Sequence, residues 1–114
     1  MTPAGFRRIA LSLPEACEGS HMEHPDFRLR NRIFATLWPD GKHGVVIVTP
    51  NEQSRLMAAS PEAFTPVKGG WGRRGSTQVQ LDLVDESLLK DAMESAWKRI
   101  APKRLQAASG LTFE

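Results

Sequence analysis

The residues best suited to binding chemistry lie in one stretch of eight, 68–75. It contains four glycines, one tryptophan and three cations. Cationic side chains bind phosphate oxygens, an indole stacks on bases, and glycine lets the backbone approach a ligand closely. Glycine also weakens helices and strands, so this stretch predicts a loop rather than a regular element. The candidate contact residues in this loop are Lys68, Trp71, Arg73 and Arg74.

A second group of cations lies at residues 28–32. Arg28 and Arg30 alternate with apolar residues, as on a half-exposed strand, and alternation places both on one face. Together with the loop cations they would form one cationic surface suited to phosphates. The alternative is that the arginines only solvate the sheet, which is about equally expected. For Trp71 a position in the core is the preferred interpretation, because tryptophan is mostly buried.

Residues of metal and acid–base chemistry occur together only at 17–24. His21-Met22-Glu23 has the His-x-Glu form of a zinc deaminase, but the Cys-x-x-Cys partner of that motif is missing because Cys17 is the only cysteine. Acidic neighbours in the sequence also make Cys17 a poor nucleophile. The interpretation is that the histidines form loop hydrogen bonds or lie near a binding surface, with His24 and Trp38 as candidates for the rim of a ligand site.

Known nucleotide and catalytic motifs are missing from the sequence. The glycine-rich stretch lacks Gly-Lys-Ser/Thr and follows no dinucleotide-binding pattern. No nucleophile–base pair or metal set can be assembled with suitable spacing. We therefore expect a protein that is not an enzyme, without cofactor or metal.

Composition indicates a folded domain. The chain has 114 residues, 40% hydrophobic and 25% charged, with a net charge of +2, so only local clustering of cations can favour nucleic acid. The length predicts a single domain over residues 1–114. A single cysteine is typical of a reducing compartment, and no segment has the form of a signal or membrane span. A cytoplasmic protein is expected.

Helical periodicity marks three segments. Thr2 followed by Pro3 is a helix start, and the apolar stripe after it ends at Pro14. A capping box at 49–52 predicts a second helix to about residue 59. A third helix begins after Asp85 and ends before Pro102. Its apolar stripe consists of Leu88, Leu89, Ala92, Met93, Ala96, Trp97 and Ile100.

Strand patterns fill the remainder of the chain. Segments 27–30, 33–38 and 45–48 predict an antiparallel meander, with the apolar 45–48 run at the centre. Segments 64–68 and 77–83 predict further strands, the last with Val79, Leu81 and Leu83 inward. Residues 15–25 have neither period and predict a long loop or a short irregular strand. The order predicts a two-layer α+β fold in which N-terminal, middle and C-terminal helices pack on an antiparallel sheet.

Four stretches resemble the MmcQ/YjbR family. They are Ile9-Ala10-Leu11-Ser12-Leu13-Pro14-Glu15, the segment from His24-Pro25-Asp26-Phe27 to Ile33-Phe34-Ala35, Gly70-Trp71-Gly72-Arg73-Arg74-Gly75, and Ala96-Trp97-Lys98-Arg99-Ile100-Ala101-Pro102-Lys103-Arg104. They occur in order over nearly the whole chain. The resemblance implies a compact domain with an antiparallel sheet in a "double wing" arrangement, which has been proposed to bind DNA. It implies no catalytic residues.

Two hypotheses of function follow. The leading one is a DNA-binding module that contacts phosphates through the hairpin arginines and the glycine-rich loop. The alternative is a domain that binds a protein or a small ligand. It predicts that the cations point apart and that Trp71 and Trp38 line an apolar pocket with His24 at its rim.

Overall fold

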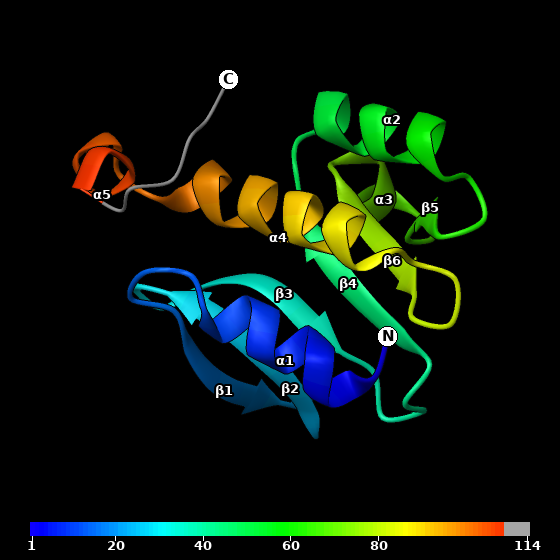
Figure 1. Cartoon of the computed structure of the whole chain (residues 1–114), viewed down its shortest axis with the longest axis horizontal. Helices are drawn as coiled ribbons and strands as arrows, with labels where there is room; N and C mark the ends of the chain where they lie inside the picture. The colour runs from blue at the N-terminus through cyan, green and yellow to red at the C-terminus, as the bar shows by residue number, and fades with distance from the viewer. Residues whose placement is uncertain (109–114) are drawn as a thin grey trace.

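The computed structural model describes residues 1–108, and in this part of the chain five helices pack on a six-stranded antiparallel sheet, an α+β fold (Figure 1). The helices are α1 (Pro3–Leu11), α2 (Pro50–Ala59), α3 (Gly70–Arg73), α4 (Glu86–Ile100) and α5 (Lys103–Ala108). The strands are β1 (Cys17–His21), β2 (His24–Leu29), β3 (Arg32–Leu37), β4 (His43–Ile47), β5 (Phe64–Pro66) and β6 (Ser76–Gln80).

The strand order in the sheet is β1-β2-β3-β4-β6-β5. Strands β2, β3 and β4 form the expected antiparallel meander, and β4 lies centrally between β3 and β6. Val45 and Val46 are both buried although their side chains point to opposite faces of the sheet. The apolar run at residues 45–48 therefore reflects a strand that is covered on both sides, as expected.

Residues 17–29 differ most from the predicted elements. Segment 15–25, expected as a loop or irregular strand, contains β1 and the first residues of β2, which pair antiparallel with His21 opposite His24. The sequence of β1 has no alternation of apolar and polar residues that would predict a strand, because β1 is an exposed edge strand without a buried face. Arg30 and Asn31 form the turn between β2 and β3, both with positive φ. The alternation that placed Arg28 and Arg30 on one face therefore ends at Leu29.

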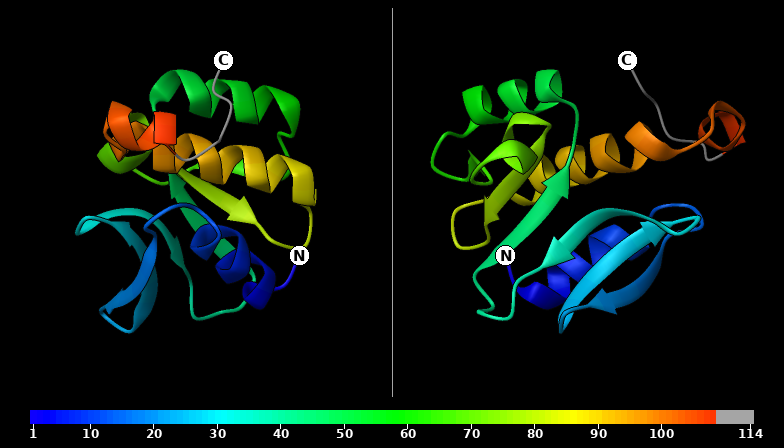
Figure 2. Two further views of the ribbon diagram at one scale, coloured as in Figure 1. Left: turned by 60° about the vertical axis from the view of Figure 1, so that its left-hand side comes forward. Right: turned by 180° about the vertical axis from the view of Figure 1, so that it is seen from behind.

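The helices begin where the capping residues predict. The Thr2 hydroxyl accepts a hydrogen bond from the Gly5 N–H, and the Thr49 hydroxyl accepts one from the Glu52 N–H. Helices α1 and α4 cover one face of the sheet (Figure 1), and the right-hand view of Figure 2 shows the molecule from behind, where β2, β3 and β4 are in front. The largest side chains without solvent exposure lie between these layers: Phe6, Phe27, Phe34, Phe64 and Trp97.

The end of β6 and the C-terminal helices show two further differences. The expected strand 77–83 ends at Gln80, and Leu83, expected to face inward, is 55% exposed in the turn before α4. Leu81 and Val79 are buried as expected. A short helix, α5, follows Pro102 and was not expected from the sequence. Within residues 1–108 no helix has both the length and the apolar character needed to span a bilayer.

Candidate nucleic-acid interface

The glycine-rich stretch contains a one-turn helix, α3, where the sequence predicts only a loop. Gly69 precedes it with φ of +79°, and Gly75 ends the stretch with φ of +116°. A Cβ atom on Gly72 would lie 1.8 Å from the Val67 carbonyl oxygen, and one on Gly75 would lie 1.7 Å from that of Val48. Three of the four glycines are therefore explained by the backbone itself, without a ligand.

Trp71 lies on the surface of α3, so the interpretation of Trp71 as a core residue is wrong. Its side chain is 66% exposed, and the Arg74 guanidinium lies 5.1 Å from the ring centroid in a cation–π contact. At about 25 cal/mol per Å² of apolar surface, burial of the exposed part of this indole would contribute roughly 3 kcal/mol to the stability of the fold. The tight contact of Gly72 with Val67 fixes the orientation of α3 and thereby keeps the indole outside.

The cations of this segment are exposed to solvent. Among the described residues, no carboxylate forms an ion pair with Lys68, Arg73 or Arg74. The Arg74 Nε–H donates to the Gly70 carbonyl oxygen at 3.3 Å, which holds the guanidinium beside Trp71. We call Lys68, Trp71, Arg73 and Arg74 the α3 patch. It combines an aromatic face with three cations that are available to bind an anion.

A buried glutamine on α2, which sequence reasoning missed, anchors this patch. The Gln53 side-chain nitrogen lies 2.9 Å from the Gly72 carbonyl oxygen and 3.2 Å from both the Ser76 carbonyl oxygen and the Thr77 hydroxyl. The Thr77 hydroxyl in turn donates to the Gly75 carbonyl oxygen. The available sequence signal was a polar residue on the inner face of an amphipathic helix. Such a residue needs buried partners, but the sequence does not identify them.

Arg28, from the hairpin group, is held by a buried carboxylate. Its Nε and Nη2 donate to the two oxygens of Asp26 at 2.6 and 3.0 Å, and His21 Nδ1 lies 2.8 Å from Asp26 Oδ2. The hydrogen bond from Arg28 is the main cause of a lowered Asp26 pKa, with His21 assisting and burial opposing. If Arg28 turned away to bind a phosphate, the buried Asp26 carboxylate would lose both hydrogen bonds from the guanidinium and keep only the contact with His21, which is costly.

Arg30 is more available than Arg28. Its Nε lies 3.3 Å from a carboxylate oxygen of Glu15, and both side chains are about half exposed. An exposed pair of this kind contributes roughly 0–1 kcal/mol, so a phosphate competes with it easily. Figure 1 shows the β2–β3 turn and α3 on different sides of the central strands β3 and β4. The hairpin arginines and the α3 patch are therefore separated across the width of the sheet.

Trp38 and His24 lie together at the other end of the strands from α3. Their rings are 5.9 Å apart, and His21 and His43 extend the row with centroid separations of 6.0 and 6.4 Å. Trp38 follows β3, whose last residue pairs with Gly44, whereas α3 leads into Ser76, which pairs with Ile47. Trp38 and Trp71 therefore do not share a pocket. Among the described residues, no cluster of His, Cys, Asp and Glu could hold a metal.

The surroundings of Cys17 also differ from the sequence interpretation. The sequence places it between acidic residues, but β1 pairs with β2 so that Cys17 lies opposite Arg28. The thiol is exposed. No base lies within hydrogen-bond distance of the thiol among the described contacts, so the geometry supplies a cationic neighbour without a nucleophile–base pair.

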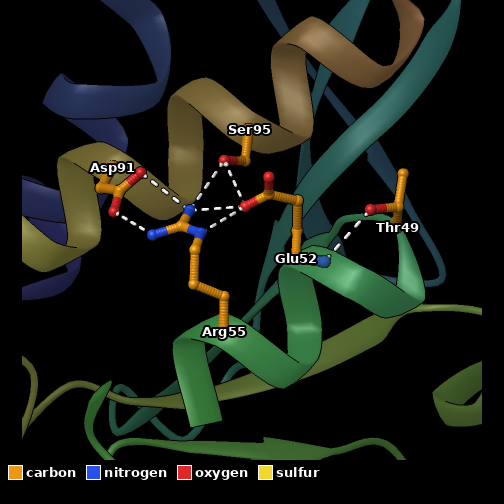
Figure 3. Close-up of polar contacts among 5 residues, drawn as sticks. All are labelled: Thr49, Glu52, Arg55, Asp91 and Ser95. Carbon is orange, nitrogen blue, oxygen red and sulfur yellow. Dashed lines mark hydrogen bonds and ion pairs between the residues drawn. The ribbon is translucent and has the colours of Figure 1, made fainter. Parts of the chain in front are cut away.

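A groove lined by polar and charged residues, which sequence reasoning missed, lies between α2, α4 and α5, with a volume of about 670 Å³. At one end Arg55 donates to both oxygens of Asp91, at 2.7 and 3.0 Å, and to Glu52 at 2.7 Å (Figure 3). The Ser95 hydroxyl accepts a hydrogen bond from Arg55 Nη2 at 3.3 Å and donates one to Glu52 Oε2 at 3.4 Å. These bonds join α2 to α4 across 36 residues of sequence, a separation at which no local pattern signals contact.

Three comparisons with known proteins complete the description of the chain. A family model described as YjbR matches residues 11–99. No protein with a curated description matches. The crystal structure of Deinococcus radiodurans protein DR2400, which has a DUF419 domain, is similar with a TM-score of 0.68 and 20% sequence identity, covering 93% of this chain and 86% of that one. At this identity the likeness shows a shared fold, and it carries no ligand or activity over to this chain.

Proposed function

This chain belongs to the YjbR family, and we propose that it is a DNA-binding member that engages single-stranded DNA through the α3 patch. Lys68, Arg73 and Arg74 contact backbone phosphates, and Trp71 stacks on a base. The observation that carries the proposal is a 66% exposed indole beside three cations that have no acidic partner within residues 1–108. Single-stranded DNA offers both an unpaired base face and phosphates to such a surface.

The fixed geometry of the patch supports this proposal. Gln53 and Thr77 hold the backbone of residues 72–77, and Gly72 packs directly on Val67. A surface ordered before binding loses little conformational entropy when the ligand arrives. We assign no phosphate contact to the hairpin arginines, because Arg28 supports the structure through Asp26 and Arg30 lies beyond strands β3 and β4 from the α3 patch.

The experiment is a titration of the protein with a labelled oligothymidine followed by fluorescence anisotropy at low salt. We expect saturable binding that weakens by about 1–3 kcal/mol in Trp71→Ala, since base–aromatic stacking has that magnitude. Trp38→Phe is the matched control because Trp38 is also exposed but lies at the other end of the strands. A duplex of the same length should bind more weakly, because its bases are not free to stack.

Three results would overturn the proposal. They are no binding to any single strand at low salt, equal loss in Trp71→Ala and Trp38→Phe, or a preference for the duplex. A change in tryptophan fluorescence on addition of a protein or small ligand that persists at high salt, without DNA binding, would instead favour the alternative function. That alternative no longer includes a pocket shared by both tryptophans, because the structure separates them.

A further inference from the structure

The groove between α2, α4 and α5 has charges of opposite sign at its two ends. Along α4, Asp91 and Glu94 come before Lys98 and Arg99, and Lys103 follows on α5. At 1.5 Å per residue, Glu94 and Arg99 are about 7.5 Å apart along the helix axis. Arg55 pairs with both Asp91 and Glu52, so among the described residues Glu94 is the carboxylate of the groove that has no cationic partner.

Glu94 is the partly buried acid of this groove. Among residues 1–108 no hydrogen bond or ion pair reaches its carboxylate, and its nearest influences are the charges of Asp91 and Lys90. Burial is the main cause that raises the Glu94 pKa, and the Asp91 charge adds to it. A partly buried acceptor without a donor is a natural position for a ligand hydroxyl or amine.

Arg99 shows the complementary situation at the basic end. Its Nε and Nη2 donate to the carbonyl oxygens of Ile47 and Ile33 at 2.9 and 3.5 Å, and within the described part of the chain no carboxylate pairs with it. Burial, followed by the nearby Arg32 charge, lowers the Arg99 pKa. Arg99 and Lys103 both line this end of the groove, and neither forms an ion pair among the described residues, so this end favours an anion.

We propose that this groove binds a phosphorylated small molecule, whose phosphate lies between Arg99 and Lys103 and whose hydroxyl or amino group donates to Glu94. A phosphate suits this end better than a carboxylate because it carries nearly two negative charges and three acceptor oxygens. The volume of about 670 Å³ lies within the range of small-molecule sites. This site is separate from the α3 patch and does not depend on DNA binding.

The test uses the full-length ¹⁵N-labelled protein titrated with ribose 5-phosphate, and with its two halves, inorganic phosphate and ribose, in separate titrations. We expect saturable amide shifts around residues 49, 94–99 and 103, with ribose 5-phosphate binding more tightly than phosphate and ribose not binding. Trp71→Ala should leave the affinity unchanged, which separates this site from the α3 patch.

The variants compare neighbouring cations. Lys103→Ala should weaken ribose 5-phosphate and phosphate roughly three- to tenfold, whereas Arg104→Ala, the adjacent exposed cation outside the groove, should leave both unchanged. Arg99→Gln should weaken both by about tenfold or more. Since Arg99 also bonds two backbone carbonyls, Lys103 carries the test if the Arg99 variant fails to fold.

Glu94→Gln tests the other end of the ligand. It should weaken ribose 5-phosphate several-fold while leaving inorganic phosphate unchanged or slightly tighter, because it removes a negative charge but also the best acceptor for a hydroxyl. The proposal would be overturned by the absence of groove shifts, by equal losses in Lys103→Ala and Arg104→Ala, or by acetate binding as tightly as phosphate.

Discussion

Asp26 shows how a single residue changes the role of its neighbours. It is the buried acid that accepts hydrogen bonds from Arg28 and His21, so a strand arginine that resembles a phosphate ligand in the sequence is a structural partner instead. The sequence spacing of Asp26 and Arg28, two residues apart on a strand, is compatible with this pair. Burial of the carboxylate, which makes the pair important, depends on the surrounding strands.

Asp26 also leads to a prediction about pH. Its pKa in the folded protein is lowered below the ordinary value of 3.8, so the ionised carboxylate stabilises the fold above that value, and this stabilisation is lost as the pH falls through the folded pKa. Asp26→Asn should therefore reduce the free energy of unfolding by roughly 3 kcal/mol near pH 7. In urea titrations the difference from the unmodified protein should shrink below about pH 4.

The matched control for Asp26 is Glu18→Gln. Glu18 pairs with Arg7 at 2.9 Å, but both side chains are substantially exposed, so this change should cost roughly 0–1 kcal/mol at any pH. A constant difference between Asp26→Asn and the unmodified protein from about pH 3 to pH 7 would contradict the assignment of the lowered pKa to Asp26.

Gly75 leads to a second prediction at this scale. Its φ is +116°, and a Cβ added at this position would lie 1.7 Å from the Val48 carbonyl oxygen, so backbone strain and a backbone collision act together. Gly75→Ala should therefore lower stability by roughly 3 kcal/mol or more in urea unfolding. Gly41→Ala is the control, because Gly41 also has positive φ but only Pro3 lies near, at 3.9 Å. Equal unfolding midpoints for the two variants would contradict the steric explanation.

At the scale of elements, α3 is too short to be stable alone and is held by its neighbours. A four-residue helix has no intrinsic stability in water. Gln53 on α2, Val67 before α3 and Thr77 on β6 together hold its backbone. The orientation of Trp71 is therefore decided by tertiary contacts, and not by the helix-forming tendency of Gly-Trp-Gly-Arg.

We expect Gln53→Met to loosen α3 selectively. The substitution removes the amide that bonds Gly72 and Ser76 but keeps the approximate volume, so stability should fall by about 1–2 kcal/mol. Hydrogen exchange at the amides of Arg74 and Gly75 should accelerate more than that at β4. Ser54→Ala, an exposed neighbour on the same helix, should change neither quantity. Unchanged exchange at α3 in Gln53→Met would show that Gly72 packing alone fixes this segment.

For the whole molecule, strand order decides which cations act together. Strands β3 and β4 lie between β2 and β6, and strands are about 4.8 Å apart, so the hairpin and the approach to α3 are separated by roughly 14 Å of sheet. A short ligand centred on the α3 patch therefore meets the three cations of that patch first, and only a longer strand would reach the hairpin arginines as well.

This separation predicts a shallow dependence of DNA affinity on salt. Three phosphate contacts to a single strand give a slope of about −2 for log K against log salt, compared with about −3.5 if Arg28 and Arg30 also took part. The combined change Arg73→Ala and Arg74→Ala should reduce the slope to about −0.7, and Arg30→Ala should leave it nearly unchanged. Anisotropy titrations over a range of salt concentrations measure this. A slope near about −3.5 that falls in Arg30→Ala would mean that one ligand reaches both groups.

The sequence alone predicted the α+β class, the three long helices and most of the strands. These features depend on local periodicity and capping, as at Thr2, Thr49 and the stripe of α4, where each residue type has its own conformational preference. It also pointed to Lys68, Trp71, Arg73 and Arg74 as a group, since they are neighbours in the chain. Their role in binding stays a prediction.

The tertiary structure decided which elements and side chains are neighbours in space. Edge strand β1, the burial of Asp26, the exposure of Trp71 and the groove between α2, α4 and α5 all depend on contacts between residues far apart in the chain. Periodicity reports which face of an element is apolar, but it does not identify the element packed against it. For that reason the contacts of Gln53, Glu94 and Arg99 can be identified only from the tertiary structure.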